Sequence, residues 1–482
     1  MSNDLHLVKW ARDAQLAQSC FRRHRIYDYK PGCVRYTFGH YPTRNPYYPT
    51  NADWEQLDMF CENGVEMLIV FEEWSDVCGY FGKQPTEPIN ERGFRRFIAE
   101  CHRRDLKVLP YVSPGYMEVR HPSYRPEWSR GAGHLVEVYQ DLDKLCPGSP
   151  GHRVQFFCSI ERLMDSYDLD GFYLDGGLGL ARPGCSNPNH DNHVHFAEIS
   201  TEGQVDVDHL KDDVVKGKLN EAFCALWNEF LLEIYVRVKN RGGTVIAHIG
   251  SDTPSPFQDK CWDYQLLGEG IGDVLASVEK TKHYDPYVIR FHDWSRLITD
   301  WERGDLTPHL DRVPGVLDLS MASSVPYLQF PWLQGGCWGE EEDQTSIPGV
   351  RWKQERDHWT EWRKALQKAG RPFLTTGIVR DRYFKYLRIY RQMTKPNTIA
   401  YIEVKGTEEE RFPVTEGARR VSVFVNDSLW VAIGHLGTEP QKVRVRSLQG
   451  DDEGETVTLS SQTLTVLRYY DLTSLPEVVQ FS

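Results

Sequence analysis

Short apolar runs rich in β-formers alternate with amphipathic helices from about residue 34 to residue 335, and this alternation limits the possible folds more than any other feature of the sequence. Strands and helices in this order are typical of parallel βαβ units. The first unit shows the pattern. An apolar run at 34–38 is followed by Trp54, Leu57 and Phe60 at helical spacing, and then by Gly64, which suits a helix C-terminus.

Further strands can be placed along the same stretch. The runs expected to form them are 65–70, 106–111, 171–175, 244–249, 264–267, either 287–291 or 315–319 as the seventh, and 325–330 as the eighth. Eight strand and helix repeats over about 350 residues predict a (β/α)8 TIM barrel with insertions, because that α/β fold needs about 250 residues and tolerates more than 400.

The pattern changes near residue 395 to alternation with a period of two. After helices expected at 359–366 and 382–393, the apolar runs are 398–404, 421–425, 429–436, 443–445, 456–459 and 464–469. Turn residues such as Asn426 and Asp427 separate these runs, which is typical of antiparallel strands. We therefore predict two domains: a catalytic barrel over residues 1–395 and a C-terminal antiparallel β-sandwich over residues 396–482.

The amino-acid composition indicates which classes of molecule the protein binds. Lys plus Arg is 56 against 69 for Asp plus Glu, so the net charge of -13 opposes binding to nucleic acid, whereas 14 Trp, 24 Tyr and 21 Phe favour binding to sugars. No apolar segment is long enough for a membrane helix, and we expect no membrane partner. The 11 scattered cysteines, together with the polar start of the chain, favour reduced thiols in a cytoplasmic protein. A homo-oligomer stays open.

Carboxylates and aromatic side chains follow the expected strands, and in a barrel the active site lies at the C-terminal ends of the strands. The residues found at these ends, from the second strand to the seventh, are Glu73, Trp74, Tyr111, Tyr173, Asp175, His248, Asp252, Glu269, Asp293 and Trp294. Among them, Asp175 and Glu269 come from strands four and six, whose ends a barrel would bring to facing positions.

Two carboxyl groups on opposite sides of a glycosidic bond can cleave it, one by attacking or directing the anomeric carbon and one by protonating the leaving oxygen. Glycines surround both Asp175 and Glu269, which leaves the backbone open to a ligand. The alternatives are structural: Asp175 could cap the helix that follows it, and Glu269 could pair with a surface arginine.

Residues 169–177, Leu-Asp-Gly-Phe-Tyr-Leu-Asp-Gly-Gly, resemble the strand-four nucleophile segment of the retaining α-glycosidases, the superfamily of (β/α)8 barrels that includes α-galactosidases, related α-glucosidases and α-fucosidases. They are also similar to a wider set of barrel glycosidases with an Asp-Gly-aromatic-x-x-Asp strand. The resemblance implies that Asp175 is the nucleophile and that Glu269 is the general acid/base. Asp252 is the alternative acid/base, since some related families take this group from strand five.

One residue of this segment differs from the residue usually found at that position in the related families. Tyr173 stands where α-galactosidases often have Lys and α-amylases have Arg. The sugar contacts of those families therefore do not transfer, and the substrate stays open. The residues expected to bind substrate are Glu73, Trp74, Tyr111, Tyr173, His248, Asp252, Asp293 and Trp294. For Glu73 and Trp74, the alternative is structural packing.

The loop after the fourth strand raises the question of a metal. Cys185, His190, His193 and His195 are zinc-ligand types within one short segment. Their spacing is not that of a zinc finger, and a loop in this position would cover the active site. We therefore favour a lid or a substrate contact, and we expect no metal and no cofactor.

The sequence thus predicts a glycoside hydrolase acting on a small oligosaccharide or glycoside by retaining double displacement. A separation of about 5 to 5.5 Å between the two carboxyl groups would fit retention, and about 6.5 to 9.5 Å would fit inversion. The alternatives are a carbohydrate-binding barrel without a working acid and a transglycosylase, which passes the same covalent intermediate to another sugar.

Overall fold

A computed structural model describes most of the chain. The described residues are 3–37, 51–71, 90–137, 140–175, 213–248, 260–268, 287–291, 309–336, 377–406, 411–450 and 452–479, with single residues at 49, 74, 88, 185, 187, 190, 275 and 481. No helix within them is both long enough and apolar enough to cross a membrane.

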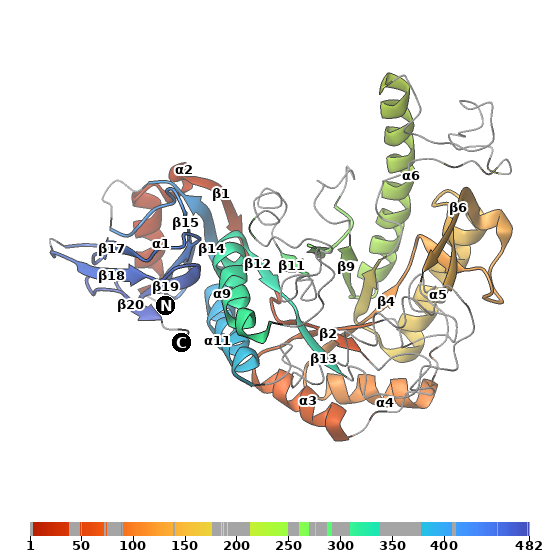
Figure 1. The fold of residues 1–482 in the computed structure, drawn as a ribbon, viewed down its shortest axis with the longest axis horizontal. Coiled ribbons are helices and arrows are strands. Elements are labelled where there is room, and N and C mark those ends of the chain that lie inside the picture. The colour runs from red at the N-terminus through yellow and green to blue at the C-terminus, as the bar shows by residue number, and fades with distance from the viewer. Residues whose placement is uncertain are drawn as a thin grey trace.

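A parallel sheet forms the centre of the larger part of the molecule (Figure 1). Its strands, in sheet order, are β12 (Gln329–Pro331), β11 (Val288–Arg290), β10 (Tyr264–Leu267), β9 (Thr244–His248), β8 (Gly171–Leu174), β4 (Lys107–Val112), β3 (Met67–Val70), β2 (Cys33–Thr37) and β13 (Leu333–Gly336). Only Trp332 separates β12 from β13, so one bent segment pairs with β11 through its first half and with β2 through its second. This arrangement fits an α/β barrel.

Helices precede the strands of this sheet as the sequence predicts. They are α3 (Asn51–Glu62), α4 (Glu91–His102), α5 (Pro150–Tyr167) and α6 (Asp213–Lys239). In α4 the apolar stripe Phe94, Phe97, Ile98 and Cys101 is buried, and the side chain of Asn90 caps the helix by accepting from the backbone N–H of Gly93 at 2.9 Å.

The seventh and eighth strand predictions are resolved by the structure. β11 lies within 287–291, so this alternative is confirmed, whereas 315–319 is wrong because it belongs to helix α9 (Val313–Ser324). Residues 325–327 form a short 3-10 helix, and the predicted strand begins only at Gln329. The helix expected at 382–393 is confirmed within α11 (Gly377–Met393), while the one expected at 359–366 lies outside the described residues.

The C-terminal part is antiparallel, as expected. A six-stranded sheet has the order β1 (Cys20–Arg25), β14 (Ile399–Val404), β15 (Arg419–Val425), β16 (Leu429–His435), β19 (Thr463–Tyr469) and β20 (Glu477–Val479). A second pair consists of β17 (Gln441–Val445) and β18 (Glu455–Leu459). The sequence did not indicate that β1 pairs with β14, which brings the N-terminal segment into this sheet. The domain boundary at residue 395 stays a prediction.

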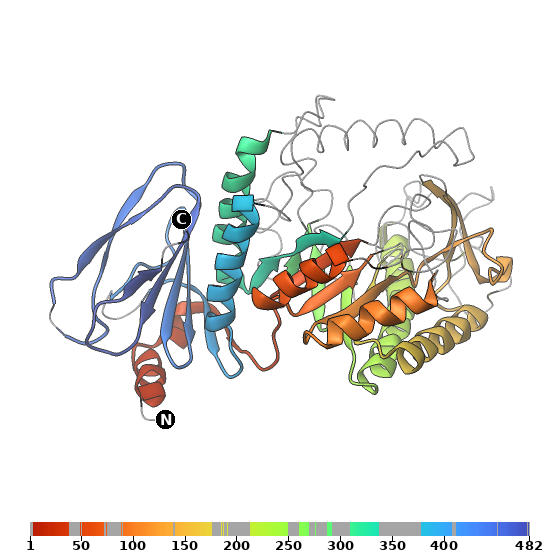
Figure 2. The ribbon, with the colours of Figure 1, turned by 90° about the horizontal axis from the view of Figure 1, so that it is seen from below.

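Both faces of the six-stranded sheet are covered, and this is why every residue of β16 is buried. Trp430 and Ala432 join the core that contains residues of α9 and α11, which lie between the two parts of the molecule (Figure 2). Val431 and Ile433 face the opposite core, which includes Trp10 of α1 (Asn3–Asp13). Alternating side chains of one strand therefore stabilise two separate cores.

A small antiparallel sheet is inserted between β4 and α5. It consists of β5 (Tyr116–Glu118), β7 (Gln140–Leu145) and β6 (Ser129–Glu137), in that order. Met117, Trp128 and Leu145 form its apolar cluster. These three strands are not among those predicted from the sequence.

A hydrogen-bonded carboxylate fixes the start of β8. The Oδ2 atom of Asp170 accepts from the backbone N–H of Val108 at 2.8 Å and lies 2.9 Å from Nε2 of His102 at the end of α4. Gly171 follows with φ +135, and a Cβ at this position would overlap the backbone of Thr244 on β9. β8 is therefore held tightly between β4 and β9.

We expect the contact between His102 and Asp170 to stabilise the fold in a pH-dependent way. The hydrogen bond to Asp170 raises the pKa of His102 above its usual value near 6.5. A raised folded-state pKa gives stability that is complete below about pH 6.5 and is lost as the pH rises through the folded-state pKa. His102→Asn should therefore lower the free energy of unfolding by up to about 1 kcal/mol near pH 6 and by less near pH 9.

Urea titrations of the wild type and of the variant across this range provide the measurement. In an Asp170→Asn background, the effect of the same histidine substitution should depend less on pH, with only the exposed carboxylate of Asp168, 3.5 Å from Nδ1 of His102, left to raise the pKa. A difference between wild type and His102→Asn that grew with rising pH would contradict the assignment.

Candidate active site

Asp175 lies directly after β8, at the C-terminal edge of the parallel sheet. Its backbone N–H donates to the carbonyl oxygen of Val112 on the neighbouring strand at 3.0 Å. In the register of β8 and β9, Leu174 lies beside Ala247, so the next pair in line is Asp175 and His248. The sheet itself thus brings together two residues that the sequence predicted for the site.

Three side chains at this edge contact one another. Tyr173 donates its hydroxyl hydrogen to Oδ2 of Asp175 at 3.0 Å, and Nδ1 of His248 lies 3.1 Å from Oδ1 of the same carboxylate. The Tyr173 hydroxyl oxygen is also 3.0 Å from that imidazole nitrogen. One donor on each carboxylate oxygen stabilises the ionised form and fixes the plane of the group.

The three residues differ in their exposure to solvent. The side chain of Asp175 is 19% exposed, whereas that of His248 is 5% exposed. Tyr173 is buried. A molecule at the mouth of the sheet can therefore reach the carboxylate, while the imidazole and the phenol hold it from behind.

Packed aromatic rings lie below this group. The ring of Tyr173 stacks on that of Phe71 with centroids 6.0 Å apart, and it contacts Tyr111 at 5.5 Å. The guanidinium of Arg35 on β2 lies 3.7 Å above the Phe71 ring. Tyr111 and Tyr173, both predicted to bind substrate, are therefore core residues here, and Tyr173 reaches the site through its hydroxyl alone.

Sequence reasoning missed Phe71 and Arg35 as supports of the site. The available signal was a charged residue inside an apolar run, since Arg35 stands between Val34 and Tyr36 in an otherwise buried strand. A charge in such a position is retained only where a partner stabilises it.

Trp74 is also placed in the core. Its indole N–H donates to the carbonyl oxygen of Tyr111 at 2.7 Å, and its ring stacks on Phe94 with centroids 5.4 Å apart. At 1% exposure it offers no face to a sugar in this structure. The placement corresponds to the packing alternative that the sequence left open for this residue.

The remaining predicted site residues lie outside the described part of the chain. They are Glu73, Asp252, Glu269, Asp293 and Trp294, together with His193 and His195 of the loop considered for a metal. The roles of these residues, and the separation of the two expected catalytic carboxyl groups, stay predictions.

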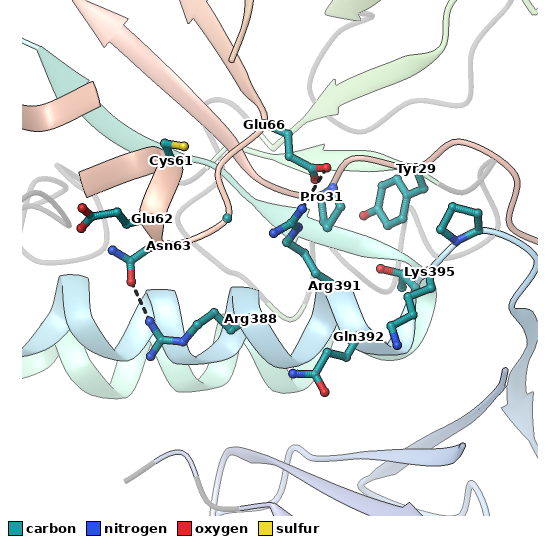
Figure 3. Close-up of a pocket in the computed structure, with 13 residues that line it drawn as sticks. Tyr29, Pro31, Cys61, Glu62, Asn63, Glu66, Arg388, Arg391, Gln392 and Lys395 are labelled. Carbon is teal, nitrogen blue, oxygen red and sulfur yellow. Dashed lines mark hydrogen bonds and ion pairs between the residues drawn. The ribbon is translucent and has the colours of Figure 1, made fainter. Parts of the chain in front are cut away.

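A cavity of about 470 Å³ lies far from Asp175 along the strand direction, near the N-terminal end of β3. Figure 3 shows Arg391 of α11 directed at Glu66 and Arg388 directed at Asn63. Burial raises the pKa of Glu66, and Arg391 at 3.2 Å opposes this shift. Active sites of barrel enzymes lie at the opposite end of the strands, so we do not assign the reaction to this cavity.

One group of side chains among the described residues could hold a metal. It consists of Cys146, Cys185 and His190, all of them buried. The last two are among the zinc-ligand types noted in the loop after the fourth strand, whereas Cys146 comes from a different segment of the chain and no local pattern connects it to them.

Comparison with protein families and with curated proteins gives no match. Among solved structures, the chain is similar to an α-amylase from Geobacillus thermoleovorans complexed with acarbose, with 12% identity over 92% of this chain and 97% of that chain and a TM-score of 0.48. It is also similar to a GH36 α-galactosidase from Geobacillus stearothermophilus, with 11% identity over 94% of this chain and 56% of that chain and a TM-score of 0.49.

An α-L-fucosidase from Paenibacillus thiaminolyticus is similar as well, with 15% identity, 66% of this chain and 48% of that chain covered, and a TM-score of 0.44. The chain thus spans about half the length of the latter two enzymes. At these identities and TM-scores, the function of the chain has to be argued from its own residues.

Substitution of Trp74 separates packing from sugar binding. Trp74→Phe keeps a ring against Phe94 but removes the donor to the Tyr111 carbonyl, so the free energy of unfolding should fall by about 1 to 3 kcal/mol. Urea titration provides the measurement. Tyr27→Phe, at a position 67% exposed, is the matched control and should change the free energy by less than about 0.5 kcal/mol. Unchanged stability with loss of sugar binding would restore Trp74 as a sugar platform.

Proposed function

We propose that the chain is a retaining glycoside hydrolase with Asp175 as its nucleophile. The observation that carries this proposal is the carboxylate at the C-terminal end of β8, partly exposed and held on both oxygens by Tyr173 and His248. The bent segment that contains β12 and β13 supports a (β/α)8 barrel, because it counts as one strand and brings the total to eight. The strand-four motif resembles that of retaining α-glycosidases, as described above.

In the proposed first step, a carboxylate oxygen of Asp175 forms a bond to the anomeric carbon while the bond from that carbon to the leaving oxygen breaks. Glu269, or Asp252 in its place, gives its proton to the leaving oxygen. The same residue then removes a proton from water, which attacks the anomeric carbon and releases Asp175 as a carboxylate.

Tyr173 and His248 act as positioning residues in this scheme. The hydroxyl of Tyr173 and the imidazole of His248 donate hydrogen bonds that favour the charged form of Asp175. This form attacks the anomeric carbon in the first step and is released as the leaving group in the second. The phenol supplies a hydrogen bond without a formal positive charge, whereas the families it resembles often place Lys or Arg at this position. The partner of Oδ2 of Asp175 is therefore an uncharged hydroxyl group.

We infer a neutral sugar as substrate, within a small oligosaccharide or glycoside. The net charge of -13 disfavours anionic ligands, and carboxylates suit hydroxyl groups as hydrogen-bond acceptors. Glu73, Asp293 and Trp294 stay the proposed contacts to its hydroxyls and ring. A cytoplasmic location and the absence of a cofactor belong to the same proposal.

The decisive substitution is Asp175→Asn, measured on a panel of aryl α- and β-glycosides. Loss of the nucleophile should lower kcat by at least about 10³-fold, while sugar-induced thermal shifts persist because the shape of the site is kept. Asp168→Asn is the matched control, since this aspartate is close in sequence but its side chain is 93% exposed. The control should retain full turnover.

Proton NMR of the first product formed by the wild type reports the anomer. Retention supports the double displacement, whereas inversion would contradict the role of Asp175 as nucleophile. If the wild type turned over no glycoside and Asp175→Asn bound sugars equally well, the carbohydrate-binding alternative would replace the enzyme. Transfer to an added sugar acceptor in place of water would indicate a transglycosylase.

A further inference from the structure

Three buried side chains from two distant segments converge beside the inserted sheet. Cys146 follows β7 directly, while Cys185 and His190 belong to the segment after β8. The two sulfur atoms and an imidazole nitrogen lie within 4.8 Å of one another, and the residues are 0%, 0% and 6% exposed. Two thiol groups and one imidazole, all of them common metal ligands, thus lie together in the protein interior.

The imidazole of His190 is oriented by a backbone carbonyl. Its Nε2 lies 2.7 Å from the carbonyl oxygen of Glu127, and because a carbonyl only accepts, Nε2 must carry a hydrogen. In the neutral ring, Nδ1 then presents its lone pair, and this atom lies 3.1 Å from Sγ of Cys185. In metal-ligating histidines one ring nitrogen commonly donates to a carbonyl while the other faces the ion, and in His190 the nitrogen opposite the carbonyl faces the sulfur of Cys185.

Backbone N–H groups are directed at both sulfur atoms. Asn187 donates to Cys185, and Gly148 and Ser149 donate to Cys146. At Cys146 these bonds are outweighed, because the hydrogen bond to Cys185 and burial raise the pKa of its thiol, so a bound zinc ion would have to displace that proton. The backbone N–H of Ser149 also donates to the carbonyl oxygen of Cys146 at 3.1 Å, so a turn that starts at Cys146 provides the donors to its sulfur.

We propose that Cys146, Cys185 and His190 bind one zinc ion. Zn²⁺ prefers thiolate and imidazole ligands in a tetrahedral arrangement. Two thiolates, a neutral imidazole and a doubly charged cation together carry no net charge, so the assembled centre can be buried without the cost of an isolated ion. The three ligands leave one coordination position, which a water molecule can fill.

The distances in the cluster fit this ion. Bonds of about 2.3 Å to sulfur and 2.0 to 2.1 Å to nitrogen place tetrahedral ligand atoms about 3.5 to 3.8 Å apart. The separation of Cys185 Sγ and His190 Nδ1 needs to open by only about 0.4 Å to reach this range. A shift of this size requires side-chain rotation alone.

The proposed centre would tie the chain after Asp175 to the inserted sheet. Direct hydrogen bonds already follow the same path, since Asn187 Nδ2 donates to the carbonyl oxygen of Ser129 at 2.8 Å and His190 donates to Glu127. A zinc ion would also connect this segment to Cys146, which lies shortly before the start of α5. This role is structural, and it holds whether or not the chain is a glycosidase. It differs from the expectation of no metal drawn from the sequence.

Metal analysis of the full-length chain tests the proposal. Protein without a histidine tag, purified without chelator from zinc-supplemented cells, should carry about one zinc ion per chain by plasma mass spectrometry. Cys146→Ser and Cys185→Ser should each lose most of it. Cys158→Ser is the matched control, because this cysteine is exposed on α5, and it should keep the zinc.

Cobalt substitution keeps the test valid if the serine variants fold poorly. Wild-type protein loaded with Co²⁺ should show thiolate-to-cobalt charge-transfer absorption in the near ultraviolet and the visible bands of a tetrahedral ion. A wild-type chain with no bound metal would overturn the proposal, whether mass spectrometry found free thiols or a disulfide between Cys146 and Cys185. Zinc retained in both serine variants would overturn it equally.

Discussion

The carboxylate of Asp175 is held between two hydrogen-bond donors at the end of a buried strand, and the rest of the account depends on this constraint. Tyr173 reaches it from two residues earlier on the same strand, and His248 reaches it from the neighbouring strand. An ionised group in this position needs such donors, because burial without them would favour its neutral form. The side chain of Asp175 nevertheless stays 19% exposed to solvent.

The scaffold around β8 keeps this geometry rigid. Asp170 anchors the strand to β4, and Gly171 allows the close approach to β9 that aligns Asp175 with His248. Aromatic packing below the site gives Tyr173 little freedom to move. If the segment after β8 is fixed by a metal at Cys185, then both sides of Asp175 along the chain are anchored.

Sequence patterns predicted the elements that carry a clear apolar pattern. These are the parallel strands, which are short apolar runs, and the helices before them, in which apolar residues recur at helical spacing. The residues 315–319 were ambiguous because α9 lies between two packed layers, so apolar residues surround it and the helical period is lost. The pairing of β1 with β14 was not foreseeable, because β1 is rich in arginine and comes from the opposite end of the chain, so no apolar pattern marks it as a strand of this sheet. The burial of Trp74 and the approach of Cys146 to Cys185 likewise depend on tertiary contacts, which no local pattern records.

Covalent labelling of the nucleophile tests the central claim most directly. Cyclitol epoxides of gluco, galacto and fuco configuration alkylate the carboxylate that attacks the anomeric carbon in retaining glycosidases. The account predicts one label per chain on the peptide that contains Asp175, located by mass spectrometry, with loss of turnover in proportion to labelling. A label on another carboxylate, or full turnover with retention by a chain labelled at Asp175, would contradict it.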